Sequence, residues 1–74
     1  MPPIPVISGQ EALKAFNRAG WVYMRRHGSH MILTKSGMNI TLSIPDHKEL
    51  DTGTLRSLIR KSGLTVEEFI NLIG

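Results

Sequence analysis

The sequence predicts an α+β domain, in which one helix precedes a three-stranded antiparallel sheet and two further helices follow it. Two observations predict this class: apolar residues recur at helical spacing near both ends of the chain, and they alternate with polar residues in its middle. The chain has 74 residues and no cysteine. We therefore expect a single domain over residues 1–74, with one core of marginal stability, no disulfide and no Cys-ligated zinc. Oligomerisation would add stability to so small a core.

The first helix is marked by residues typical of helix ends. Residues 1–6 contain three prolines, which disfavour helix, so we expect an extended N-terminal segment. Ser8 and Glu11 have the spacing of a capping box, and Gly20 is suited to a left-handed helix stop. A helix is expected between these signals, with Phe16 on its buried side.

Three strands are expected from alternation of apolar and polar residues. The expected strands are residues 21–26, 30–35 and 39–44. In the first, Trp21 and Tyr23 share one face; in the third, Ile40, Leu42 and Ile44 point toward the core. The short connections between the strands predict an antiparallel meander.

Two helices are expected after the sheet. Asp51 or Thr52 is placed to cap the first of them, and Gly63 to end it. Thr65 and Glu68 form a second capping box, so a short terminal helix is expected to follow and to depend on packing for its stability.

The chemically richest part of the chain is its middle. Residues 21–48 hold four of the nine Lys and Arg residues but only one of the six Asp and Glu residues, so the whole net charge of +3 lies there. The cations are Arg25, Arg26, Lys35 and Lys48, and the three histidines of the chain, His27, His30 and His47, lie in the same window. This balance favours an anionic partner, of which nucleic acid is the commonest. The histidines lack the spacing of ligands that share a helix face, so no metal is expected.

No apolar run approaches the roughly 20 residues of a membrane span, and the N-terminus lacks the pattern of a signal peptide. We therefore expect a soluble, cytoplasmic protein without a membrane partner.

Six short motifs occur in a characteristic order and at characteristic spacings along almost the whole chain. They are Ile4-Pro5-Val6-Ile7-Ser8-Gly9, Ala19-Gly20-Trp21, Arg25 through Gly28-Ser29-His30, Ile44-Pro45-Asp46-His47-Lys48-Glu49-Leu50, Gly53-Thr54-Leu55-Arg56 and Lys61-Ser62-Gly63-Leu64-Thr65. With these motifs the sequence resembles the HicA (YcfA-like) toxin family. The resemblance implies a double-stranded-RNA-binding-domain-like fold and the activity of an mRNA interferase. It also implies a toxin of a type II toxin–antitoxin system, neutralised by a HicB-like antitoxin in a complex that could be oligomeric.

The same resemblance assigns site residues. His30 matches the catalytic histidine of the family's Gly-Ser-His motif, and Gly28 and Ser29 match its supporting turn. Many relatives have a second histidine directly after the first, whereas this chain has Met31 there. Only one imidazole is therefore available at that point.

These residue types suit metal-independent RNA cleavage, in which the substrate's own 2′-hydroxyl is the nucleophile. Imidazole, with an unperturbed pKa of about 6.5, can act as general base or acid at neutral pH. We expect His30 to take this role and Arg25, Arg26, Lys35 and Lys48 to contact phosphate. His47, in the loop after the third strand, is the first candidate for a second acid or base, with a structural role as a loop anchor as its alternative. His27 is the other candidate, but it is expected to be a solvated residue at the strand end. The sequence does not place the second group.

Other interpretations remain for the same features. Trp21 and Tyr23 could stack on bases or belong to the core. The cationic helix face of Arg56, Arg60 and Lys61 could bind RNA or merely aid solubility. The whole chain could be a non-catalytic RNA-binding module, or a partner of the antitoxin whose own activity has decayed.

Overall fold

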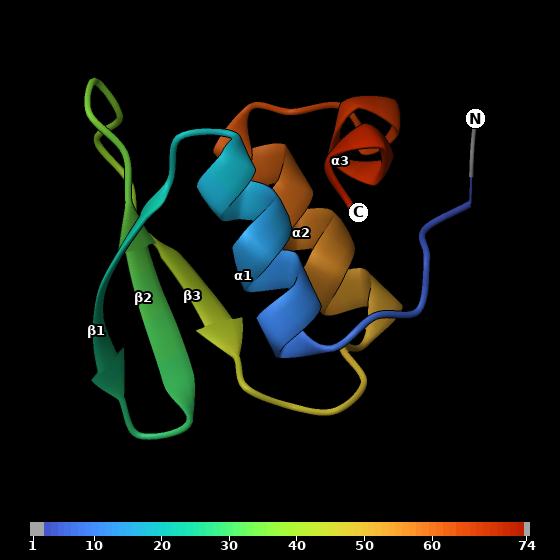
Figure 1. Ribbon diagram of the computed structural model, residues 1–74, viewed down its shortest axis with the longest axis horizontal. Helices are drawn as coiled ribbons and strands as arrows, with labels where there is room; N and C mark the ends of the chain where they lie inside the picture. The colour runs from blue at the N-terminus through green and yellow to red at the C-terminus, as the bar shows by residue number, and fades with distance from the viewer. Residues whose placement is uncertain (1–2, 74) are drawn as a thin grey trace.

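The structure, a computed structural model, describes residues 3–73. The first two residues of the expected extended N-terminal segment, and Gly74 at the end of the expected domain, lie outside the described residues. The elements are α1 (Gly9–Arg18), β1 (Val22–His27), β2 (His30–Thr34), β3 (Leu42–Pro45), α2 (Thr52–Ser62) and α3 (Val66–Leu72) (Figure 1). Residues 3–8 belong to no helix or strand. This order confirms the predicted α+β class.

The three strands form one antiparallel sheet in the order β1-β2-β3. All three helices lie on the same side of this sheet (Figure 1). The core lies between the two layers and consists of Ile7, Ala12, Ala15, Phe16, Trp21, Met31, Leu33, Leu42, Ile44, Leu50, Leu55, Leu58, Ile59 and Phe69. Within residues 3–73 no helix covers the second face of the sheet, and we call this face the open face.

The predicted helix starts are confirmed. The Ser8 side chain accepts a hydrogen bond from the Glu11 amide at 3.1 Å, while the Glu11 carboxylate accepts one from the Ser8 amide at 3.0 Å. Thr65 and Glu68 form the same reciprocal pair at the start of α3. Of the two candidates for the cap of α2, the structure selects Asp51. Short-range chemistry therefore determines where these helices begin.

The prediction that the first strand begins at Trp21 is wrong, since β1 begins at Val22. The Trp21 amide donates to the Phe16 carbonyl at 3.0 Å, so this residue completes the end of α1 instead of pairing with β2. Its side chain is fully buried, which places it in the core. A register shift between Tyr23 and Arg25 then interrupts the simple alternation along β1.

Ile40 was expected in the core, and this prediction is also wrong, because its side chain is 41% exposed. The ladder between β2 and β3 ends at the pair Leu33 and Leu42. Beyond that pair the chain enters a turn, in which the Met38 amide donates to the Lys35 carbonyl at 3.1 Å. Among the described residues, Ile40 thus has no strand partner, and its side chain is not buried between the sheet and the helices.

Candidate functional site

The candidate site is built on the tight hairpin between β1 and β2. Gly28 and Ser29 form a two-residue turn, and His27 and His30 are register partners on either side of it. Gly28 has φ +62°, whereas no residue other than glycine has a positive φ in the described part of the chain. A positive φ at the first central residue alone is typical of a type II′ turn. A Cβ on Gly28 would meet nothing within 4 Å, so backbone conformation, and not lack of space, requires glycine here.

The two histidines lie on the open face of the sheet. Met31 is buried under the helices, so its neighbour His30 projects to the opposite side. His27 lies directly across from His30 and shares its face, and both side chains are exposed. Arg25 is the register partner of Ile32, two residues along β2 from His30, and therefore lies on the same face. One imidazole pair and one guanidinium thus occupy neighbouring positions on the open face.

Arg26 lies on the other side of the sheet, toward the helices, because it pairs with Met31. There it forms an ion pair with Asp46, whose second carboxylate oxygen accepts a hydrogen bond from Gln10 at 3.2 Å. The Arg26 guanidinium is thereby engaged by a carboxylate of the protein itself. Sequence reasoning did not identify Asp46 as its partner, although Asp46 is the single acidic residue between positions 21 and 48.

The loop after β3 is attached to both the hairpin turn and α1. The Asp46 amide donates to the Ser29 carbonyl at 2.8 Å, and the Gly9 amide donates to the His47 carbonyl at 2.9 Å. Gly9 comes so close to this loop that a Cβ on it would lie 2.1 Å from the Pro45 carbonyl oxygen. The loop therefore brings His47 to the same end of the sheet as the hairpin, but its backbone turns toward the helix layer.

The two lysines predicted to bind phosphate lie in different places. Lys48 follows His47 and is exposed at the hairpin end of the sheet. Lys35 is half-buried, and a Cβ on Gly20 would lie 3.2 Å from its Cε atom. At about 3.3 Å per residue it lies about 16 Å along the strand direction from His30. The structure does not bring Lys35 to the histidines.

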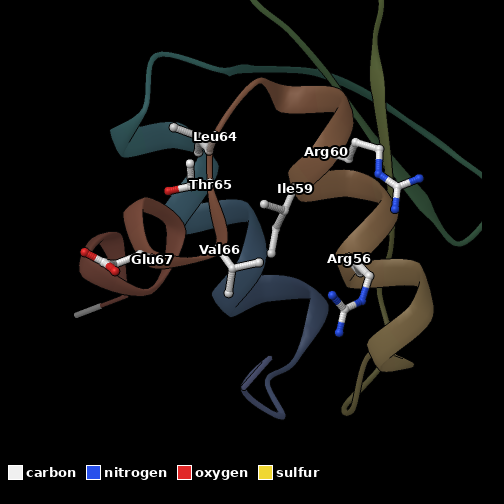
Figure 2. A pocket seen from close by; sticks show the side chains of 7 residues that line it. All are labelled: Arg56, Ile59, Arg60, Leu64, Thr65, Val66 and Glu67. Carbon is white, nitrogen blue, oxygen red and sulfur yellow. The ribbon is translucent and has the colours of Figure 1, made fainter. Parts of the chain in front are cut away.

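A groove between two helices lies away from this hairpin. This groove, of about 640 Å³, runs between α2 and α3, with Arg56 and Arg60 on the α2 side and Glu67 on the α3 side (Figure 2). Its other lining residues are Ile59, Leu64, Thr65 and Val66. A second hollow of about 300 Å³ lies on the helix side of the sheet and is lined by Gln10, Leu13, Tyr23, Arg26 and Met31. Neither includes the two paired histidines, which lie on an open surface accessible to a polymer.

Residues 3–73 contain no group of three or more His, Asp or Glu side chains arranged so that they could hold a metal ion. Within the same residues, no helix has the length and apolar character needed to cross a membrane.

The family described as "HicA toxin of bacterial toxin-antitoxin" matches residues 9–64, a stretch that includes the whole hairpin and the loop after β3. Among solved structures, the chain is similar to one described as "Toxin-Antitoxin complex from Streptococcus pneumoniae", with 30% sequence identity and a TM-score of 0.70. The similarity covers 84% of this chain and 100% of that chain. A comparison with curated proteins gave no match. The chain therefore belongs to the HicA toxin family of bacterial toxin–antitoxin systems.

Proposed function

We propose that this HicA toxin is an endoribonuclease that cleaves mRNA without a metal ion, with His30 as a general base or acid. The observation that carries the proposal is the position of His30. It lies beside a tight hairpin turn, its side chain is exposed on the open face, and Arg25 lies on the same face. An uncovered sheet face can admit a long nucleic acid strand, whose phosphates would meet Arg25 while an imidazole reaches the scissile bond.

In the proposed reaction the substrate's 2′-hydroxyl attacks the adjacent phosphorus. The products are a 2′,3′-cyclic phosphate and a 5′-hydroxyl. Arg25 stabilises the charge that develops on the phosphoryl oxygens. Gly28 has no side chain and lets the RNA backbone approach the turn, where the Ser29 hydroxyl can donate a hydrogen bond. Lys48 adds a positive charge at the same end of the sheet.

We further propose that a HicB-like antitoxin neutralises the toxin by covering His30 and the open face. The similar Streptococcus pneumoniae chain comes from a toxin–antitoxin complex, which supports such a partner. An antitoxin with an acidic surface would match the exposed Arg25 and Lys48. Charge complementarity of this kind accelerates association, and salt weakens it. An association rate that does not change with ionic strength would contradict the electrostatic part of this proposal.

The proposal is tested by expressing the wild-type chain and His30→Ala in parallel and following growth and message decay. The purified proteins are then incubated with RNA in the presence of a chelator, after circular dichroism has shown that both are folded. Thr41→Ala, exposed near the opposite end of β3, serves as the matched surface control.

We expect cleavage and growth arrest by the wild type and Thr41→Ala, and neither by His30→Ala. A folded wild type that binds RNA without cutting it would favour the RNA-binding module. A wild type that binds only the antitoxin would favour decayed activity. Both results would refute the nuclease proposal.

A further inference from the structure

We propose that His27 is the second proton-transfer group of this site and works together with His30. This inference rests on the proposed nuclease function. It starts from one observation: His27 and His30 are register partners, directly opposite each other in the β1–β2 ladder.

RNA cleavage by the 2′-hydroxyl requires two proton transfers. The bond between O2′ and phosphorus forms as O2′ loses its proton to a neutral imidazole. The bond between phosphorus and O5′ breaks as O5′ takes a proton from an imidazolium. No atom is lost, and the two imidazoles have exchanged their protonation states, which water then restores. A site with one acid and one base serves both events in the same step.

The hairpin places two such groups at a suitable separation. Directly opposite residues of an antiparallel pair have Cβ atoms about 5 Å apart and project from the same face. His27 and His30 hold these positions beside a two-residue turn, which keeps the register from slipping. Both rings can therefore approach a single phosphate on the open face, one from each strand.

His47 lacks this relation to His30. The β3 residue opposite His30 is Pro45, so His47 lies two residues beyond the end of the ladder. Its carbonyl accepts from Gly9 on the helix side, and the preceding Asp46 is engaged with Arg26 there. These contacts attach the backbone of the loop to α1, whereas His27 alone is held in register with His30 by the ladder.

The charged groups around the pair are few. Arg25 lies two residues from His27 on the same face, and the loop after β3 carries Asp46, Lys48 and Glu49. Asp46 is already paired with Arg26, whereas Arg25 forms no ion pair within residues 3–73. A guanidinium beside the imidazole pair fits a phosphate bound between them.

The test uses three matched variants, His27→Gln, His30→Gln and His47→Gln, together with the double variant of the first two. Glutamine keeps a polar side chain of similar reach but cannot transfer a proton at neutral pH. Each variant is first shown to fold by its circular dichroism spectrum and its Tm. The substrate is a short single-stranded RNA that contains a site cut by the wild type, and single-turnover rates are measured as a function of pH.

We expect His27→Gln and His30→Gln each to lower the rate by about 10²–10⁴-fold, the usual contribution of one acid or base. The double variant should be little worse than the poorer single variant, because the two groups act as a unit. The wild-type pH–rate profile should have two limbs, and each of these single variants should lose one of them. His47→Gln should keep both limbs.

A modified substrate supplies a readout that a merely structural role would not change. Replacing O5′ of the scissile phosphate by sulfur gives a leaving group that departs without protonation. One of the two variants, the one that lacks the acid, should then recover most of the wild-type rate. If the wild type cleaves RNA but His27→Gln retains both its rate and its pH profile, or His47→Gln loses a limb, the inference is wrong. Failure of the folded wild type to cleave would instead refute the proposed function.

Discussion

Replacing Gly9 by alanine tests the junction between α1 and the loop after β3. A Cβ at this position would lie 2.1 Å from the Pro45 carbonyl oxygen and 3.1 Å from the Cα atom of Asp46. Contacts below 3.0 Å essentially never occur for real Cβ atoms, so helix and loop must separate by about 0.9 Å, the difference between 2.1 Å and 3.0 Å. Both neighbours are backbone atoms, which cannot rotate away as a side chain would.

The energetic effect follows from three contributions. Overpacking of this kind typically costs about 1–3 kcal/mol. Loss of the hydrogen bond from the Gly9 amide to the His47 carbonyl costs about 1 kcal/mol more. Alanine is a better helix former than glycine, which offsets at most about 1 kcal/mol of this loss in the free energy of unfolding. The expected net loss in the free energy of unfolding is therefore about 2 kcal/mol. For a domain of this size it corresponds to a fall in Tm of roughly 8–16 °C.

The assay is thermal and urea unfolding of the purified protein, followed by circular dichroism. Gly53→Ala is the matched control, since Gly53 also lies in the first turn of a helix, and its Cβ would meet only the Asp51 carboxylate, at 3.0 Å. We expect Gly53→Ala to be neutral or slightly stabilising. If Gly9→Ala unfolds at the same temperature as the wild type or Gly53→Ala, the tight approach of α1 to the loop is refuted.

Three further predictions concern the sheet. Arg25→Ala should slow RNA cleavage and weaken RNA binding at low salt much more than Arg26→Ala, since only Arg25 lies on the open face; equal effects in a cleavage titration would contradict this assignment. Leu42→Ala should lower the free energy of unfolding, measured with urea, by about 2–5 kcal/mol. Ile40→Ser should leave the free energy of unfolding within about 0.5 kcal/mol of the wild-type value. A large loss for Ile40→Ser would show that Ile40 belongs to the core after all. Gly28→Ala should lower the free energy of unfolding by about 1–2 kcal/mol through backbone strain alone, and an unchanged Tm would show that the turn does not need a positive φ.

The sequence predicts those parts of the fold that depend on near neighbours. The capping boxes of Ser8 and Thr65 and the stop at Gly63 are each contained within four residues, and the structure has all three. The errors arise where a residue's state depends on distant partners. Trp21 continues the apolar–polar alternation of β1 in the sequence, yet its amide donates a hydrogen bond to Phe16 at the end of α1 and not to a neighbouring strand. Ile40 continues the alternation of β3 in the sequence, yet the β2–β3 ladder ends at Leu33 and Leu42, so Ile40 has no partner on β2.

The same distinction applies to the site. The motif around His30 was recognisable from the sequence, but the pairing of its two histidines depends on the turn having two residues instead of the three first expected. The ion pair between Arg26 and Asp46 joins residues 20 positions apart, and no local pattern predicts it. The register of β1 places Arg25 on the open face and Arg26 on the helix side, where the ion pair with Asp46 engages its guanidinium. Neighbours in sequence, Arg25 and Arg26 are therefore not equivalent candidates for binding RNA.

The proposed activity and the stability of the domain depend on the same backbone contacts at this end of the molecule. The hairpin turn is bonded through Ser29 to the loop after β3, and that loop is bonded through His47 to Gly9 at the start of α1. Pro45, against which Gly9 packs, is also the register partner of His30. A change at Gly9 will therefore displace the strand beside the histidine pair as well as destabilise the domain. Its effect on cleavage should persist well below its Tm, whereas an effect due to unfolding alone would disappear on cooling. Comparing rates at several temperatures below the transition separates the two causes.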